Sequence, residues 1–364
     1  MKRLTALALA LILALSLAAC NGGGNTLNNN TSTEPPNIPL QGDIGSVHTE
    51  DNERTFEQAP NTNTNLPQED ETIAYTDDVE SISIDIMAAN AYVINIDTNS
   101  VLYEKNSNER IAPASTAKIL AALTALDYCA LEDTFTVGSE IDLIASDSSK
   151  AGLNNGDTLT FRQLLAALLL PSGNDAAYTL AVNAGRIIAG DNSLNSKQAI
   201  KLFVDAMNSK AKEAGATSSN FVTPDGYDAN GQYTTAVDLA QIAKVCLDND
   251  VLSEITSSYK IYDTLTNGRE IVYSNTNELL NPNSQYYYSN AIGLKTGTTG
   301  NAGSCLISAA TINEQTYICV VMGSSAGVRF SDSLAVFSAI DPTISLPVET
   351  GGAPGSAPGG QTRG

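Results

Sequence analysis

Histidine is almost absent from this 364-residue sequence. Its one histidine, His48, lies in a polar, acidic stretch. Histidine is the usual proton acceptor for a nucleophilic serine and the commonest protein ligand of catalytic zinc. The sequence therefore argues against a serine-histidine pair and against a zinc site, and we expect no metal and no cofactor.

Cysteine is also scarce. Besides Cys20 the chain has four cysteines, each in an apolar segment and none in a C-x-x-C spacing: Cys129, Cys246, Cys305 and Cys319. We predict that these four are buried free thiols. If Cys305 and Cys319 lie on paired strands joined around Asn313, they are about three residues out of step, which disfavours a disulfide.

Positive charge is the third deficit. The chain has 19 Lys and Arg against 40 Asp and Glu, a net charge of −21. This balance argues against a nucleic-acid partner, which basic surfaces attract. Most of the excess acid lies between Glu34 and Asp85, so the net charge says little about a folded domain.

Long apolar runs are missing except at the N-terminus, where Lys2 and Arg3 precede "LTALALALILALSLAAC". This run is shorter than the roughly 20 residues that span a bilayer, and it is typical of an export signal. The ending "LAAC" resembles the lipobox of bacterial lipoproteins, in which the cysteine receives a diacylglycerol. We therefore expect residues 1–20 to be a lipoprotein signal peptide with Cys20 as the lipidated residue; the alternative is ordinary cleavage near the same place.

Composition divides the remaining chain into three parts. Residues 21–80 are rich in Asn, Thr, Pro and acid, which predicts a disordered acidic tether that spans roughly 45 Å or more. Residues 81–342 change periodicity repeatedly without a Pro/Gly-rich break, which predicts one folded domain. Residues 343–364, ending in "GGAPGSAPGGQTRG", form a low-complexity tail.

The folded part begins and ends with strand patterns. We expect hairpins over 91–97 with 101–106 and over 259–265 with 270–275, strands over 291–297, 304–311 and 316–323, and helices over 115–131, 158–170, 174–187, 196–215, 234–247 and 329–340. In the fourth helix one face should hold Ile200, Phe203, Val204, Met207 and Ala211. This order predicts an α/β fold with an antiparallel sheet built from both ends and an inserted helical lobe.

A candidate nucleophile with its own base lies in "APASTAKIL". Ser115 and Lys118 are three residues apart, so a helix brings both side chains to one face. A lysine has an ordinary pKa near 10.4 and needs a shift of about three units, or roughly 4 kcal/mol, to act as a base near neutrality. Burial, the helix N-terminus and a second lysine nearby would each lower its pKa.

Two further motifs follow in order. "PSGN" places Ser172 and Asn174 on a tight turn between helices, and "LKTG" places Lys295 on a strand that leads to a glycine. Each motif alone is weak. The combination S-x-x-K, S-x-N and K-T-G, in this order and on these elements, is the set found in penicillin-binding proteins and β-lactamases.

From about residue 89 to 339 the chain resembles the D-alanyl-D-alanine carboxypeptidases of low molecular mass. The resemblance extends to "DTLTFRQLLAALLLPSGNDAA", "SNFVTPDGYDANGQYTTAVDLA" and "IGLKTGTTGNAGSCLISA". It implies a β-lactamase/transpeptidase-like fold and an acyl-enzyme mechanism on peptidoglycan stem peptides. It also implies inhibition by β-lactams and, with the predicted lipid, a place on the outer face of the bacterial membrane.

The resemblance also implies a role for each catalytic residue. Ser115 would attack the carbonyl between the two terminal D-alanines, and Lys118 would accept its proton. Ser172 would relay a proton to the departing D-alanine. Asn174 would hold the stem-peptide amide and help to fix Lys118, whereas Asp175 is expected to cap a helix.

Further residues are implied for substrate binding. Lys295 and Thr296 would attract the terminal carboxylate, and Gly297 would permit close approach. The backbone N–H groups of Ser115 and Thr298 would form the oxyanion hole. Arg329 lies about where the family has a carboxylate-binding arginine, one residue short in spacing; the alternative is an exposed arginine at a helix N-terminus.

Three alternatives share this pocket. An endopeptidase would cut cross-links between stems. A class A β-lactamase carries an E-x-x-L-N turn and an Asp between the motif's Ser and Asn, whereas this chain lacks the turn and has Gly173. A silent peptidoglycan-binding lipoprotein would bind without turnover. Many relatives also carry a C-terminal β-rich domain and an amphipathic membrane helix; we expect the Cys20 lipid to replace that anchor.

Overall fold

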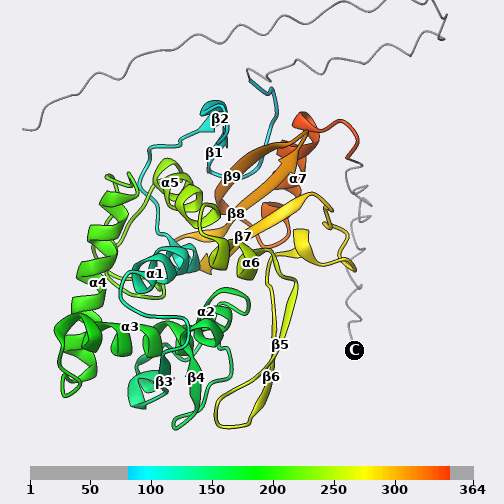
Figure 1. Ribbon diagram of the computed structural model, residues 1–364. Coiled ribbons are helices and arrows are strands. Elements are labelled where there is room, and N and C mark those ends of the chain that lie inside the picture. The colour runs from blue at the N-terminus through cyan, green and yellow to red at the C-terminus, as the bar shows by residue number, and fades with distance from the viewer. Residues whose placement is uncertain (1–80, 345–364) are drawn as a thin grey trace, which may run out of the picture. The chain divides into compact units, whose positions relative to one another are not determined.

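The computed structural model describes residues 81–344. The predicted signal peptide with Cys20, the tether and most of the tail lie outside these residues. In the described part, strands at both ends enclose a largely helical middle, which is the order expected from the sequence (Figure 1).

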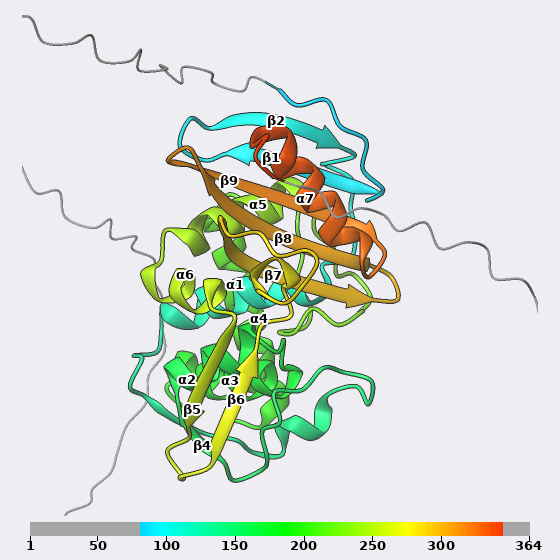
Figure 2. The same cartoon turned by 90° about the vertical axis from the view of Figure 1, so that its right-hand side faces the viewer.

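A five-stranded antiparallel sheet forms the centre, in the order β2-β1-β9-β8-β7 (Figure 2). Its strands are β1 (Asn90–Asn95), β2 (Ser100–Lys105), β7 (Ala291–Thr299), β8 (Gly303–Ile312) and β9 (Gln315–Ser324). β1 pairs directly with β9, so the N-terminal hairpin joins the three C-terminal strands. The prediction of a sheet built from both ends is confirmed.

The sheet is covered on both faces, which explains why its central strands lack polar alternation. On β8, Leu306 and Ala310 belong to one apolar cluster with Phe337 of α7 (Val328–Ile340). The alternate residues, such as Ile307, belong to the larger cluster on the opposite face with α1 (Ala117–Leu126) and α5 (Ala236–Leu247). Figure 1 shows α7 and α5 on opposite sides of the sheet.

The helical lobe lies between the two halves of the sheet in sequence. It contains α2 (Phe161–Leu169), α3 (Asn174–Ala189), α4 (Ser196–Glu213), α6 (Asp250–Ser257), the small strands β3 (Thr134–Thr136) and β4 (Thr158–Thr160), and the 3-10 turn η2 (Ser139–Leu143). The hairpin β5 (Lys260–Thr264) and β6 (Glu270–Ser274) runs alongside this lobe, and η3 (Glu278–Leu280) leads back to the sheet (Figure 2). On α4 the predicted inner face is buried, except that Ile200 is only partly buried.

Two helices have bounds in the structure that differ from those predicted from the sequence. The helix expected over 115–131 ends at Leu126, because the Asp133 carboxylate accepts the Ala130 N–H (2.8 Å) in a turn that leads into β3. The helix expected from residue 158 begins at Phe161, because Thr160 and Gln163 form a capping box and residues 158–160 pair as β4. α6 was not predicted.

The cysteine predictions agree with the structure. The four cysteines in the described part are free and buried. Cys319 pairs with Ser308, three residues from Cys305, which is the expected offset. Burial raises the pKa of each thiol, that of Cys319 to about 12, so these residues are packing groups.

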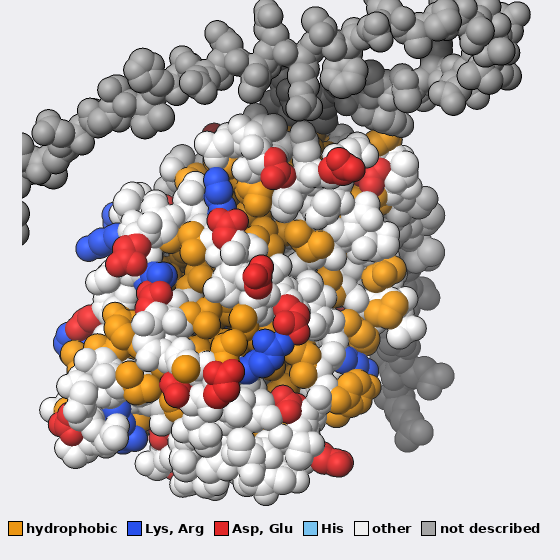
Figure 3. Space-filling model, viewed as in Figure 1, with side chains coloured by type: hydrophobic (Ala, Val, Ile, Leu, Met, Phe, Trp, Pro, Cys, Tyr) orange, Lys and Arg blue, Asp and Glu red, His pale blue; other side chains and the backbone are white. Residues whose placement is uncertain are grey.

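The surface carries charges of both signs. On the face in Figure 3, acidic and basic side chains are interspersed among apolar ones. Among residues 81–344, no helix has both the length and the apolar character needed to cross a bilayer.

Candidate active site

Ser115 lies at a strained chain entry to α1. It is in the short 3-10 turn η1 (Ala114–Thr116), and the preceding Ala114 has a left-handed φ of 49°. The α-helix itself starts two residues after Ser115, so the expected helical start is corrected to a 3-10 turn. Side chains at i and i+3 eclipse in 3-10 geometry, and the Ser115 Oγ to Lys118 Nζ distance is 2.7 Å.

Lys118 is fully buried beside Ser115. Its Nζ also donates to Asn174 Oδ1 (2.8 Å) and to the Asp225 carbonyl (2.9 Å). Desolvation lowers the pKa of Lys118 to about 8, against the opposing attraction of the Asp225 and Asp175 carboxylates. About a tenth of the Lys118 amine is therefore neutral at pH 7, next to the Ser115 hydroxyl.

A second buried lysine, Lys295, comes from β7. It is 1 % exposed and donates to the Thr296 carbonyl (2.9 Å). Burial, and next the neighbouring charges of Lys118 and Arg329, hold the pKa of Lys295 well below its ordinary value. A second lysine was expected to lower the pKa of Lys118, but burial is what lowers that pKa, and the repulsion between the two lysines lowers the pKa of Lys295 instead.

The turn between α2 and α3 supplies the second motif. Ser172 has a φ of 62° and is 5 % exposed. A Cβ on Gly173 would lie 2.6 Å from Ala151 Cβ and 2.8 Å from the Ala167 carbonyl, which explains the glycine where other families carry Asp. Asn174 Oδ1 accepts a hydrogen bond from Lys118 Nζ, and Asn174 Nδ2 donates one to Ser148 Oγ (2.9 Å).

The prediction that Asp175 caps a helix is wrong, because the N-cap of α3 is Gly173, with no side-chain cap hydrogen bond, and Asp175 lies in the first turn. Its carboxylate accepts the N–H of Ala176 in the first turn of α3. It also accepts the N–H groups of Ala151, Gly152 and Leu153 at 2.8 to 3.0 Å. Asp175 thus fixes the loop that forms one wall of the cleft.

The outer edge of β7 packs against η1, the 3-10 turn that carries Ser115 (called the nucleophile turn below). A Cβ on Gly297 would be 2.9 Å from Ala114 Cβ and 3.0 Å from the Ser115 nitrogen, so only glycine permits this approach. Next to it, Thr296 Oγ1 is 2.5 Å from Thr276 Oγ1.

Arg329 reaches this edge from α7. Its Nη1 donates to the Gly297 carbonyl (3.1 Å) and to Thr298 Oγ1 (3.0 Å), and its guanidinium stacks on Phe330 at 4.8 Å. Its Nε is buried without a partner in the described part of the chain. Arg329 is therefore an inward-facing cation at the site.

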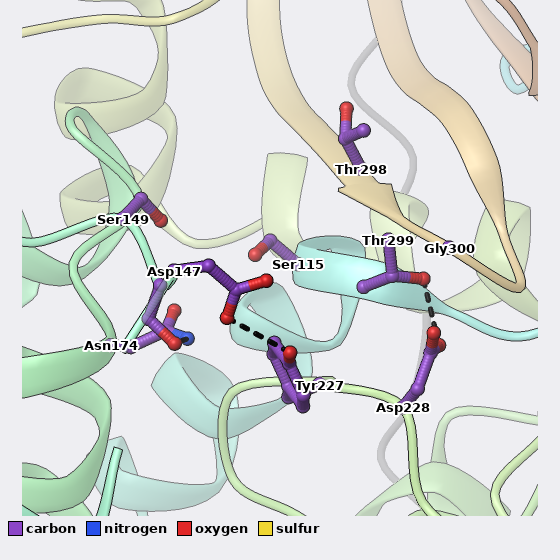
Figure 4. Close-up of a pocket in the computed structure, with 10 residues that line it drawn as sticks. Ser115, Asp147, Ser149, Asn174, Tyr227, Asp228, Thr298, Thr299 and Gly300 are labelled. Carbon is purple, nitrogen blue, oxygen red and sulfur yellow. Dashed lines mark hydrogen bonds between the residues drawn. The ribbon is translucent and has the colours of Figure 1, made fainter. Parts of the chain in front are cut away.

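Two adjoining cavities share Ser115 and five other lining residues: Asp147, Ser149, Thr298, Thr299 and Gly300. The larger, about 590 Å³, is also lined by Ser172, Thr296, Gly297 and Arg329. The smaller, about 110 Å³, is lined by Asn174, Asp147, Tyr227 and Asp228 (Figure 4). The structure thus brings the three sequence motifs to one cleft, with Ser115 at the junction.

Some site residues were missed by sequence reasoning. The Asp225 carbonyl binds Lys118, and Gly226 lies against the nucleophile turn, where a Cβ would be 1.8 Å from the Ala114 carbonyl. The Asp-Gly pair in "PDGYD" signals a tight turn. Nothing in the sequence indicates that this turn, about 110 residues away, supports Ser115.

A sheet edge that carries a buried lysine and faces a serine-lysine pair defines a serine acyl-transfer enzyme of the penicillin-binding type. The family model described as D-alanyl-D-alanine carboxypeptidase, Peptidase S11, matches residues 76–326. The chain therefore belongs to the Peptidase S11 family, whose members are serine peptidases that act on peptidoglycan.

Individual relatives agree with this assignment. The chain is 34% identical over 241 residues to D-alanyl-D-alanine carboxypeptidase DacF of Bacillus subtilis, covering 65% of this chain and 58% of that protein. It is 33% identical over 264 residues to the D-alanyl-D-alanine carboxypeptidase of Streptomyces sp. strain K15, covering 70% and 87%.

Solved structures confirm the predicted fold. The Streptomyces K15 DD-transpeptidase structure matches with a TM-score of 0.64 at 31% identity, covering 70% of this chain and 97% of that one. A D-alanyl-D-alanine carboxypeptidase structure from Mycobacterium tuberculosis matches with a TM-score of 0.62 at 31% identity, covering 72% and 95%.

Proposed function

We propose that this protein is a serine-type carboxypeptidase that removes the terminal D-alanine from peptidoglycan stem pentapeptides. The main support for this proposal is the 2.7 Å hydrogen bond between Lys118 Nζ and Ser115 Oγ. Lys118 is buried, and its pKa is lowered to about 8. This pair supplies both a nucleophile and a base in the described part of the chain, without histidine.

The geometry supports the following acylation step. The neutral Lys118 amine takes the Ser115 proton as Oγ attacks the carbonyl between the two D-alanines. The backbone N–H groups of Ser115 and Thr298 stabilise the resulting oxyanion, and the close approach at Gly297 brings these two segments together. Loss of one such donor typically costs about 3 kcal/mol.

The leaving group departs on the side of the larger cavity. Ser172 passes the proton to the amine of the departing D-alanine, whose carboxylate is held by Lys295, Thr296 and Arg329. Water then attacks the Ser115 ester, gives up a proton to the same base, and releases the shortened stem with a carboxyl group. Asn174 holds the stem amide and keeps Lys118 in place.

Product analysis distinguishes the candidate reactions. Mass spectrometry of a stem pentapeptide and a cross-linked dimer, each incubated with the protein, is expected to show free D-alanine from the pentapeptide. Cleavage of the dimer alone would indicate an endopeptidase. Because the K15 relative is also described as a DD-transpeptidase, an added amine acceptor is included, and its attachment to the peptide would indicate transfer. Rapid release of hydrolysed penicillin would indicate a β-lactamase, and binding without product a silent protein.

Arg329→Gln tests the carboxylate site. We expect KM for the pentapeptide to rise about tenfold or more with a smaller change in kcat, because a charge-assisted hydrogen bond to the carboxylate is lost. Arg162→Gln removes a half-exposed arginine paired with Glu254 and serves as the control. An unchanged KM in Arg329→Gln would contradict the assignment.

The location of the protein is also part of the proposal. We infer that Cys20 carries a diacylglycerol and that residues 21–80 hold the catalytic domain away from the outer face of the membrane. The support is the export signal and the "LAAC" sequence. Two acyl chains give a stable anchor where one does not.

Cys20→Ser is expected to move the protein from the membrane fraction to the soluble extracytoplasmic fraction. Fractionation followed by penicillin labelling measures this change. Cys129→Ser, at a buried thiol of the domain, is the control and should stay with the membrane. Retention of Cys20→Ser in the membrane fraction would rule out this anchor.

A further inference from the structure

The loop over residues 147–157 forms one wall of the catalytic cleft and contacts the second motif directly. The Ser149 carbonyl accepts the Asn174 N–H (2.9 Å), and the Ser149 hydroxyl donates to the Ser172 carbonyl (2.7 Å). Next to it, Ser148 Oγ accepts Asn174 Nδ2 (2.9 Å). Figure 4 shows Ser149 and Asn174 on the same side of the smaller cavity. The positions of Ser172 and Asn174 therefore depend on this loop.

The loop has little apolar packing of its own. Its sequence is "DSSKAGLNNGD", in which Leu153 is the one large apolar residue, and it contains no helix or strand. Apart from Leu153 and Asp157, its residues are exposed or only partly buried. Polar contacts must therefore fix the loop, and Asp175 supplies three of them at residues 151–153 from the side of α3.

The far end of the loop is held by the turn of the β5–β6 hairpin, which lies close to β4 (Figure 2). Arg269 Nη2 donates to Asp157 Oδ2 (2.5 Å), and Asn267 Nδ2 donates to Asp157 Oδ1 (2.9 Å). The same Arg269 nitrogen also donates to the Gly152 carbonyl (3.0 Å). Arg269 thus contacts both the middle and the end of the loop.

The Asp157–Arg269 ion pair is the least exposed ion pair within residues 81–344. Its side chains are 7 % and 33 % exposed, whereas each of the other pairs has a partner that is at least 44 % exposed. Burial raises the pKa of Asp157, but a backbone hydrogen bond from Asn154 and the hydrogen bond and charge of Arg269 outweigh it, so this pKa lies below its ordinary value. Solvent screens such a pair less than a fully exposed one.

These contacts connect the hairpin to the base. Asn174, which the loop holds through Ser148, accepts Lys118 Nζ on its Oδ1 (2.8 Å). We propose that Arg269 is a positioning residue for acylation, which acts by holding the loop over residues 147–157 against Asn174. Arg269 lines neither cavity, so it acts through the loop and not on the substrate. The inference rests on the acylation step of the proposed function and adds a residue to it.

Arg269→Gln tests this role. Stopped-flow measurements with a fluorescent penicillin give the Kd of the first complex and the acylation rate constant. We expect the rate constant at pH 7 to fall about tenfold with less than a twofold change in Kd, because a misplacement of about 1 Å costs up to about 100-fold. Arg269→Lys keeps the charge and should stay within about threefold of the unaltered protein. Arg162→Gln breaks the exposed pair with Glu254 and should leave the rate constant unchanged.

The pH profile separates positioning from a general loss of stability. A loosened loop admits water to Lys118, and weaker desolvation raises its pKa from about 8 toward its ordinary value. The substitution leaves the neighbouring charges of Asp225, Asp175 and Lys295 in place. Because the neutral amine is the reactive form, the rise in the acylation rate constant should move to higher pH. The deficit of Arg269→Gln should therefore be largest at pH 7 and shrink by pH 9.5.

Asn267→Asp is a second, milder variant at an exposed position. It leaves Arg269 in place but sets a second carboxylate against Asp157, and it should slow acylation about threefold at pH 7. Thermal unfolding checks that each variant is folded. If Arg269→Gln does not fold, unchanged acylation by Asn267→Asp would overturn the inference.

Two results for a folded Arg269→Gln would also overturn the inference. One is a rate constant equal to that of Arg162→Gln. The other is a loss that is the same at every pH and is not recovered in Arg269→Lys, which would indicate a structural role only. If the unaltered protein is not acylated at all, the proposed function fails as well. Acylation without release of D-alanine would overturn the proposed carboxypeptidase function alone, because the test of Arg269 measures acylation.

Discussion

Ser115→Ala is expected to carry no penicillin label and to release no measurable D-alanine from a stem pentapeptide. The hydroxyl lies 2.7 Å from the Lys118 amine, and it is the one group of this contact that can form an ester. Loss of the nucleophile in enzymes of this kind reduces kcat by about 10⁴-fold or more. Mass spectrometry of the tryptic peptide that contains residue 115, after incubation with a labelled penicillin, measures the result.

The change is small enough to leave the fold intact. Ser115 lies in a 3-10 turn that is held by backbone hydrogen bonds and by Thr116. The Thr116 hydroxyl donates to the Pro113 carbonyl (2.6 Å). Ser149→Ala removes another hydroxyl from the same cleft and should still be labelled. Persistent labelling of Ser115→Ala would show that the ester forms elsewhere.

Lys118→Met is expected to lower the acylation rate constant by about 10³-fold, the usual contribution of a positioned base. Methionine fits the buried stem of the side chain but cannot accept the Ser115 proton. Stopped-flow acylation by a fluorescent penicillin measures this rate constant. Lys295→Ala is the comparison: it should mainly weaken binding of the carboxylate, so equal and small losses in the two variants would contradict both roles.

The pH dependence of acylation tests the same base. The pKa of Lys118 is lowered to about 8, and the reactive form is the neutral amine. The rate constant at saturating penicillin should therefore rise as pH increases through about 8, about tenfold between pH 7 and pH 9, and then level off. Lys118→Arg should remove this rise because its guanidinium stays charged. A flat profile in the unaltered protein would argue against Lys118 as the base.

The fold was largely predictable because its strands carry strong local signals. The Asn267-Gly268 turn between the alternating residues of β5 and β6 defines a hairpin without tertiary information. The predicted β8–β9 register placed Cys305 and Cys319 correctly. The end of α1 and the short strand β4 were missed, because each depends on a side-chain turn or pairing that helical propensity does not report.

The candidate site was predictable where it is encoded in short motifs. Ser115, Lys118, Ser172, Asn174 and Lys295 lie together, as their order in the sequence suggested. The Asp225 carbonyl and the Asp147–Tyr227 hydrogen bond were not predictable, because they join segments about 80 to 107 residues apart. Long loop contacts of this kind depend on the finished tertiary structure.

The pairing of β1 with β9 has a consequence for biosynthesis. A growing polypeptide contains Ser115 and Lys118 well before it contains β7, so the proposed nucleophile is synthesised long before the strand that completes the proposed oxyanion hole. Because contacts so distant in sequence form late, competence for acyl transfer arises only when the last third of the chain has joined the first strands. Nascent chains are therefore expected to lack acyl-transfer activity until the last strands of the catalytic domain have been synthesised and paired.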